Sequence, residues 1–346
     1  MKDELFRSGG RYNVRRTGHD EYTTSLPMPT DEQGMTAREC PEPECAPGYF
    51  KITFGTGVED PDYDRCYCPY CRREGDQSDF HTEGQMDYAA SVVEKETVAG
   101  VQRMMKDALG LDSRGRRRMG SDFLSIEMSM KSSRPRPVRM PFEEELRRDV
   151  TCPHCTLAHA VFGLAVWCAD CGKDIFLTHL AAELEVIRKV LAEVADRRER
   201  LGARVAARDI ENALEDIVSI FEAVMKFIYK RRLTDTAGED EAQRKLAGLR
   251  NAFQNPERSA QIARDDLGVD LFDPIEAEHA QTIKTTFQKR HAITHNLGVV
   301  DRKHLEHGDG AEGLGREVSL TAAEVSGTVD LLEQVLSGVY QRLFTL

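Results

Sequence analysis

The chain has 346 residues, of which 31% are charged and 40% hydrophobic, and a formal net charge of −12. This length allows two or three folded domains, and the negative balance excludes a protein that coats nucleic acid through overall basicity. The longest apolar run, around His159 to Trp167, is too short to cross a bilayer. The first ten residues are charged and lack an apolar core, so we expect no secretory signal and a cytoplasmic location.

Eight of the nine cysteines gather in four close pairs along the chain, and Cys66 is left over. In a chain without an export signal, such pairs favour metal ligation in a reducing compartment over a disulfide framework. The first pair follows residues 1–35, a polar stretch rich in Gly, Thr, Asp and Arg, which we expect to be a flexible tail.

Residues 36–84 are predicted to form a first zinc ribbon, in which four thiolates hold Zn²⁺ in a tetrahedral cage that replaces a hydrophobic core. The alternation from Tyr49 to Phe54 predicts a strand between the two cysteine pairs. Cys66 is an alternative to Cys68 or an inert thiol, and His81 is a second alternative ligand. The expected ligands are Cys40, Cys45, Cys68 and Cys71.

Residues 85–140 are predicted to comprise a helix, a basic loop and a linking strand. Apolar residues at helical spacing from Met86 to Leu109 predict the helix, which ends at Gly110. Alternation from Leu124 to Lys131 predicts the strand. From Arg114 to Arg139 eight residues are basic and two acidic, so the loop is either a solvated surface or a local contact for a phosphate backbone. The candidate nucleic-acid-binding residues are Arg114, Arg116, Arg117 and Arg118.

Residues 141–174 carry the strongest metal motif and are predicted to form a second zinc ribbon. Two CxxC pairs are separated by 12 residues that include an apolar run, an arrangement typical of two metal-binding turns joined by a short hairpin. Closed four-cysteine sites are structural, so we expect about two Zn²⁺ ions per chain and no catalytic metal. The expected ligands are Cys152, Cys155, Cys168 and Cys171.

Residues 175–346 are predicted to form an all-α domain of four or more helices. Apolar residues recur at helical spacing from Leu177 to Val194 and from Ile210 to Ile228, and a capping box from Thr321 to Glu324 begins the last helix. The predicted fold class is therefore α+β and multidomain, with N-terminal zinc ribbons of short antiparallel strands and a C-terminal helical bundle.

Within this bundle, the stretch from Phe287 to Asn296 reads FQKRHAITHN and places Arg290 and His295 near the end of an expected helix, with four residues between them. This pair, the polar His291 after the arginine, and the setting in the second half of a helical domain resemble the HEPN superfamily. The resemblance implies a metal-independent endoribonuclease that acts on RNA as a homodimer in bacterial defence or toxin systems, with an antitoxin or defence-system protein as a further partner. It implies that Arg290 and His295 are catalytic, with His291 and Asn296 beside them.

The residue types suit RNA cleavage without a metal, in which the substrate's own 2′-OH attacks the phosphorus. Histidine titrates near neutral pH and can transfer the proton, while a planar guanidinium stabilises charge on the phosphoryl oxygens. Five positions along a regular helix turn about 140°, so Arg290 and His295 do not share one face.

Three other interpretations of the motif stay open. His291 and His295 are four residues apart and share a helix face, as two zinc ligands do, but the glutamate of an HExxH motif is missing. Histidines on a helix are also often core or surface residues without chemistry. Finally, a HEPN-like domain can be retained for dimerisation alone, in a non-catalytic zinc-ribbon protein that binds nucleic acid or regulates a partner.

Overall fold

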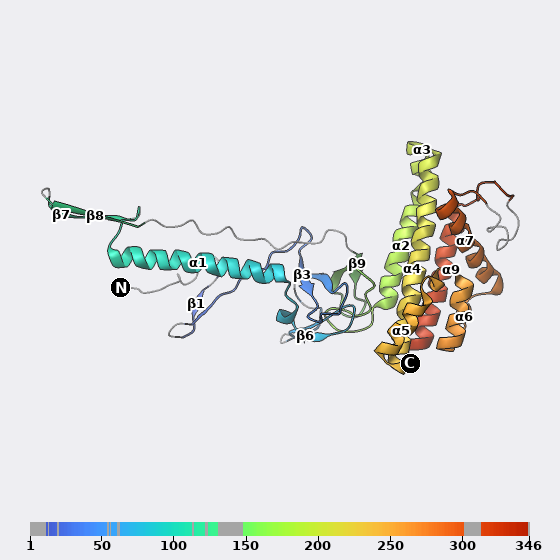
Figure 1. The fold of residues 1–346 in the computed structure, drawn as a ribbon, viewed down its shortest axis with the longest axis horizontal. Helices are drawn as coiled ribbons and strands as arrows, with labels where there is room; N and C mark the ends of the chain where they lie inside the picture. Colours follow the sequence, from blue (N-terminus) through green and yellow to red (C-terminus); the bar gives the residue numbers. More distant parts are fainter. Residues whose placement is uncertain are drawn as a thin grey trace. The chain divides into compact units, whose positions relative to one another are not determined.

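The computed structural model describes residues 12, 14–18, 21–53, 55, 57–60, 63–112, 114–121, 124–130, 148–300 and 313–344, without the side chains of residues 121, 124, 125 and 295. The chain divides into two compact units, Met1–Gly163 with Trp167–Asp174 and Leu164–Val166 with Ile175–Leu346 (Figure 1). The first unit combines small antiparallel sheets with one long helix, and the second is built from helices. Within the described ranges, no helix has both the length and the apolar character that a membrane span needs.

One antiparallel sheet of four strands joins the two cysteine-rich modules. Its strand order is β3–β4–β10–β9, and β4 pairs with β10 so that Ile52 lies opposite His159. The modules predicted as two ribbons therefore share one folded core, in which Ala37, Phe50 and Ala160 are fully buried. The strands are β3 (Met35–Glu39), β4 (Tyr49–Thr53), β9 (Arg148–Thr151) and β10 (Ala158–Val161).

Shorter antiparallel pairs accompany this sheet. The pair β1 (Arg15–Arg16) and β2 (Tyr22–Thr23) lies within the predicted tail, of which residues 1–11 are outside the described residues. The pair β5 (Arg65–Tyr67) and β6 (Glu74–Asp76) leads into the short helix η1 (Gln77–Phe80). The strand predicted between the first cysteine pairs is β4, and only its last expected residue, Phe54, is not described.

Helix α1 (Glu83–Leu109) confirms the predicted helix, including its end at Gly110, where φ is 63°. A capping box begins it, because the Thr82 side chain accepts from Gln85 N while the Gln85 side chain accepts from Thr82 N. The Gln85 amide also donates to Ala37 O at 3.0 Å. The first turn of α1 is thus tied to the edge strand β3.

The predicted basic loop is wrong for three of its arginines. Arg116, Arg117 and Arg118 lie in β7 (Arg116–Ser121), which pairs with β8 (Leu124–Ser129) along its whole length. Asp112 shapes the entry to β7 by accepting from Arg114 N at 2.9 Å and Arg116 N at 2.8 Å. A run of arginines shows no polar–apolar alternation, so the strand could not be recognised from the sequence. It forms because the segment pairs with β8. The predicted strand is β8, while Lys131 and the residues up to 147 are outside the described residues.

The second unit packs its helices around α4, which is 35 residues long and contacts α2, α7 and α9. Phe176 of α2 stacks on Phe227 and on Tyr340 at ring-centroid distances of 5.2 and 4.0 Å, and Phe221 meets Phe287 of α7 edge-on at 5.3 Å. These contacts confirm an all-α second unit across the described residues. Its elements are α2 (Phe176–Ala192), α3 (Val194–Leu201), α4 (Ala203–Ala237), α5 (Glu239–Leu249), η2 (Ala252–Gln254), α6 (Pro256–Leu267), α7 (Ala277–Asn296) and α9 (Ala322–Phe344).

Three residues between the cysteines of the second metal motif belong to the helical unit. Leu164–Val166 packs with it although Gly163 and Trp167 belong to the first unit. Ile175 N donates to Val166 O at 2.7 Å, and Ala165 N donates to Nδ1 of the buried His179 at 2.9 Å. The chain therefore passes between the units more than once, and the expected boundary at 174/175 is only one of the crossings.

Candidate metal centres and the Arg290 cluster

Three CxxC turns in the first unit have the same backbone geometry. The carbonyl of each first cysteine accepts from the amide four residues later, at 3.0 Å in all three turns. The residue after each second cysteine is left-handed, with φ between 62° and 64°. These residues are Arg72, Thr156 and Gly172. Such a tight turn points both sulfurs of a pair toward one centre, which is how CxxC pairs hold zinc.

The turns bring the eight predicted ligand sulfurs into two tetrads. The first contains Cys40, Cys45, Cys68 and Cys71, and the second contains Cys152, Cys155, Cys168 and Cys171. Within each tetrad the sulfurs lie within 4.8 Å of one another, and the closest pairs are 3.5 to 3.8 Å apart. A Zn–S bond of about 2.3 Å requires sulfurs at the corners of a tetrahedron with edges of about 3.8 Å. Both tetrads can therefore hold a zinc ion.

Without a cation between them, most of the tetrad thiols resist ionisation, although a hydrogen bond with Cys68 lowers the pKa of Cys71 to about 5. Burial raises the pKa of Cys45 and of Cys155 to about 12. Backbone amides supply only partial compensation, since Tyr70 N donates to Cys68 Sγ at 3.4 Å and His154 N donates to Cys152 Sγ at 3.3 Å. A divalent cation at the centre would stabilise four thiolates at once, so metal binding would release protons.

The structure also distinguishes the candidate ligands from nearby cysteine and histidine residues that belong to neither tetrad. Cys66 is fully buried in β5 and, like His81, is absent from both tetrads, so the first tetrad uses Cys68. Burial raises the pKa of Cys66 to about 12, which is the behaviour of an inert thiol. The buried His159 of β10 places Nε2 at 3.4 Å from Cys168 Sγ. An imidazole N–H there can stabilise the thiolate without joining the tetrad.

The two tetrads are connected by hydrogen bonds between their own turns. Tyr67 N, beside Cys68, donates to Ala169 O at 2.8 Å, and Trp167 N, beside Cys168, donates to Pro69 O at 3.1 Å. Asp170, in the Cys168 turn, also holds the loop after β4, because its carboxylate accepts from Gly57 N at 2.7 Å. The turn of each tetrad thus completes the hydrogen bonding of the other, so the tetrads form one structural unit.

In the helical unit, Arg290 is held by partners from two other elements. Its Nε donates to Glu215 Oε2 of α4 at 2.6 Å, and its Nη1 donates to Gln254 Oε1 of η2 at 3.1 Å. The side chain is 23% exposed and makes no other hydrogen bond among the described residues. Its remaining N–H donors are therefore available to an anion that approaches from solvent.

The other residues of the motif are placed differently. Thr294 donates to the second oxygen of Glu215, so Arg290 and Thr294 both face α4. Asn296 ends α7 and donates from Nδ2 to Val299 O at 2.7 Å. His291 is half-buried, and the backbone of His295 lies in the last turn of α7 while its side chain is outside the described residues.

The two partners of Arg290 were not predicted from the sequence. Glu215 and Gln254 lie 75 and 36 residues from Arg290 and carry no motif of their own. A signal was present in α4, where charged residues recur at spacings of three and four, but a solvated helix face shows the same pattern. Lys289, next to Arg290, points elsewhere and donates to Glu324 Oε1 at 2.8 Å and to Ser319 O at 2.7 Å.

The arginines of β7 are not equivalent. Arg117 Nη1 donates to Leu109 O at 2.9 Å, so this guanidinium caps the carboxyl end of α1. Arg114, Arg116 and Arg118 are exposed, and so is Arg117. All four predicted nucleic-acid-binding arginines are therefore exposed, and Arg117 has a structural role as well.

The resemblance to the HEPN superfamily rests on the sequence around Arg290 and His295 and on its helical setting. No protein-family model, curated protein or solved structure matches the chain.

Proposed function

We propose that the helical unit is a metal-independent endoribonuclease of the HEPN type, in which Arg290 and His295 are catalytic. The observation that carries the proposal is the state of Arg290. Glu215 and Gln254 fix its guanidinium on one side, its remaining N–H donors make no hydrogen bond among the described residues, and the side chain is 23% exposed. A fixed and partly exposed guanidinium is suited to bind a phosphodiester without reorganising.

In the proposed reaction the 2′-OH of the substrate attacks the adjacent phosphorus, and the bond from phosphorus to the 5′-oxygen of the next nucleotide breaks. His295 transfers a proton in this step, from the 2′-OH or to the leaving 5′-oxygen. Arg290 stabilises the charge on the two non-bridging oxygens. Glu215 acts as a positioning residue, and His291 and Asn296 orient the site or the RNA. Zinc in the two cysteine tetrads is structural and takes no part in the chemistry.

The test is cleavage of total RNA by purified protein in excess EDTA. We expect cleavage to continue at first, because closed four-cysteine sites release zinc slowly, and we expect 2′,3′-cyclic phosphate ends. A substrate with 2′-deoxyribose at the cleaved position should resist, since the nucleophile is missing. Cleavage that requires added Mg²⁺ would contradict the proposal.

The proposal includes a homodimer formed through the helices after Ile175. One arginine and one histidine are few groups for a catalytic site. A two-fold axis that brings two motifs to one cleft would double the number of catalytic side chains there. Light scattering at micromolar concentration should give twice the chain mass of 39.0 kDa. A fully active monomer would rule out this arrangement. By the same resemblance, an RNA-cleaving toxin or defence effector would have an antitoxin or defence-system protein as its partner.

A second candidate function is a zinc-stabilised nucleic-acid-binding or regulatory protein whose helices only dimerise. The exposed Arg114, Arg116 and Arg118 around β7 favour it, since they form a local basic surface on an acidic chain. RNA binding without any cleavage by the wild-type protein would place this candidate ahead.

A further inference from the structure

A second basic surface lies in the helical unit, at the reversal between α3 and α4. The segment from Arg197 to Arg208, here termed the α3–α4 tip, contains five arginines and one glutamate. Gly202 makes the reversal with φ of 95°, a conformation that other residues rarely adopt. In Figure 1 the tip extends past the ends of α7 and α9. Like-charged side chains are thus concentrated on a protruding end of the bundle, in a chain whose net charge is negative.

The acidic neighbours of the tip only partly neutralise it. Arg204 and Arg208 share one carboxylate, that of Glu211, at 2.7 and 2.9 Å. Arg197 pairs with Asp209 at 3.2 Å. Two further arginines, Arg198 and Arg200, have no ion pair among the described residues. The tip therefore presents uncompensated guanidinium groups to solvent.

A polar stripe connects the tip with Arg290. Arg204, Arg208, Glu211 and Glu215 follow one another at spacings of four, three and four residues, so they lie on one face of α4. Glu215, the last of them, binds Arg290 at 2.6 Å. Eleven residues of helix rise about 16 Å, and a single strand with stacked bases covers that distance with about five nucleotides at 3.4 Å each.

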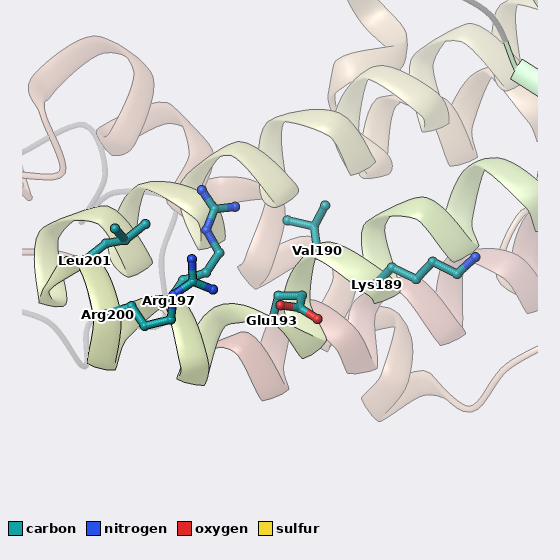
Figure 2. Close-up of a pocket in the computed structure, with 6 residues that line it drawn as sticks. All are labelled: Lys189, Val190, Glu193, Arg197, Arg200 and Leu201. Carbon is teal, nitrogen blue, oxygen red and sulfur yellow. The ribbon is translucent and has the colours of Figure 1, made fainter.

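A shallow groove beside the tip indicates what kind of contact it makes. It is lined by Lys189, Val190, Glu193, Arg197, Arg200 and Leu201. Figure 2 shows the Arg197 and Arg200 side chains between Leu201 and Glu193. The lining combines three cations with one carboxylate and two aliphatic side chains and contains no aromatic ring, so it can bind phosphates and sugars but offers no surface on which bases stack.

We propose that the α3–α4 tip binds the sugar–phosphate backbone of single-stranded RNA, independently of its sequence, and guides it along α4 to Arg290. That the bound RNA is guided to Arg290 rests on the proposed ribonuclease function. RNA fits better than a membrane surface, because the arginines of the tip lie at one end of a face of α4 whose other end, Glu215, holds Arg290 of the candidate phosphodiester site. RNA also fits better than an acidic protein, because backbone phosphates match guanidinium groups in regular spacing.

The test uses the full-length protein with Arg198→Glu and Arg200→Glu together. The matched control is Arg232→Glu with Arg244→Glu, which makes the same change in charge near the other end of α4 and on α5. Binding of a fluorescent 20-nucleotide oligouridylate is measured by anisotropy over a salt series, in a His295→Ala background that prevents cleavage. Melting temperature and light scattering check that both variants fold and assemble like the parent.

We expect the tip variant to raise Kd about tenfold at moderate salt and to reduce the slope of log K against log salt by about 1.4, because each lost phosphate contact removes about 0.7 for single strands. With His295 intact, KM should rise by a similar factor while kcat stays unchanged.

Equal effects of the tip and control variants, or no effect of the tip variant, would overturn the inference. Tip-dependent binding to phosphatidylserine vesicles or polyglutamate as tight as binding to RNA would also overturn it. A wild-type protein that binds RNA through the tip but never cleaves it would contradict the ribonuclease function and leave the binding surface intact.

Discussion

Replacing Cys152 with serine is expected to remove both metal ions, not one. Metal analysis of the wild-type protein should give about two zinc ions per chain, and the variant should retain close to none. The reason is the hydrogen bonding between the tetrads, in which Tyr67 N beside Cys68 donates to Ala169 O, and Trp167 N beside Cys168 donates to Pro69 O. A structural zinc contributes about 10–16 kcal/mol in apparent binding free energy, so its loss would disorder the turns that the second tetrad requires.

Cys66→Ala is the matched control, because it removes a buried thiol from the same unit without touching either tetrad. This variant should keep both zinc ions, at some cost in the melting temperature of the first unit. Retention of one zinc by Cys152→Ser would show that the tetrads fold as independent ribbons. Loss of a zinc by Cys66→Ala would restore Cys66 as a ligand.

Arg290→Ala and His295→Ala are each expected to lower the rate of RNA cleavage on the order of 10²- to 10³-fold, which is the usual cost of removing a positioned acid–base group or a charge donor. Both variants should keep the wild-type melting temperature within a few degrees and the wild-type mass. His291→Ala should cost less. Cleavage rates are measured on one defined oligonucleotide, and cleavage that persists in His295→Ala would exclude this histidine from the mechanism.

Two variants distinguish catalysis from nearby charge. Lys289→Met removes the neighbouring cation, but its ammonium is held by Glu324 and Ser319 O, so cleavage should stay close to wild type. Glu215→Ala should lower kcat by releasing Arg290, and Glu215→Gln should recover part of the activity because an amide oxygen still accepts from Nε. Failure of Glu215→Gln to exceed Glu215→Ala would show that Glu215 does not act by positioning Arg290.

Local patterns in the sequence predicted the local structures well. A CxxC pair specifies its own turn, so three of the four ligand pairs could be located from spacing alone, and the sulfurs confirm the two tetrads. Helix α1 followed from apolar spacing and from Gly110. In each of these cases the interactions that decide the structure lie within a few residues of the chain.

Long-range pairings could not be predicted in the same way. The β4–β10 pairing joins residues more than a hundred positions apart, and the sequence of neither strand indicates which strand it pairs with. The contact between Arg290 and Glu215 is similar, since a glutamate on a helix resembles any solvated residue until the neighbouring helix is placed. The arginines of β7 were predicted as a loop for a different reason. Consecutive charged side chains are typical of a loop, whereas here the pairing with β8 makes the segment a strand.

The position of Leu164–Val166 has a consequence for how the two units can be separated. A fragment that begins at Ile175 would keep every helix of the second unit but lose the three residues that this unit borrows from between the cysteines. His179 would then lose the amide of Ala165 that donates to its buried Nδ1, and Ile175 would lose the carbonyl of Val166. No single cut of the chain yields both units whole. If such a fragment lost activity, the cause could be the missing part of the helical core or the missing zinc module.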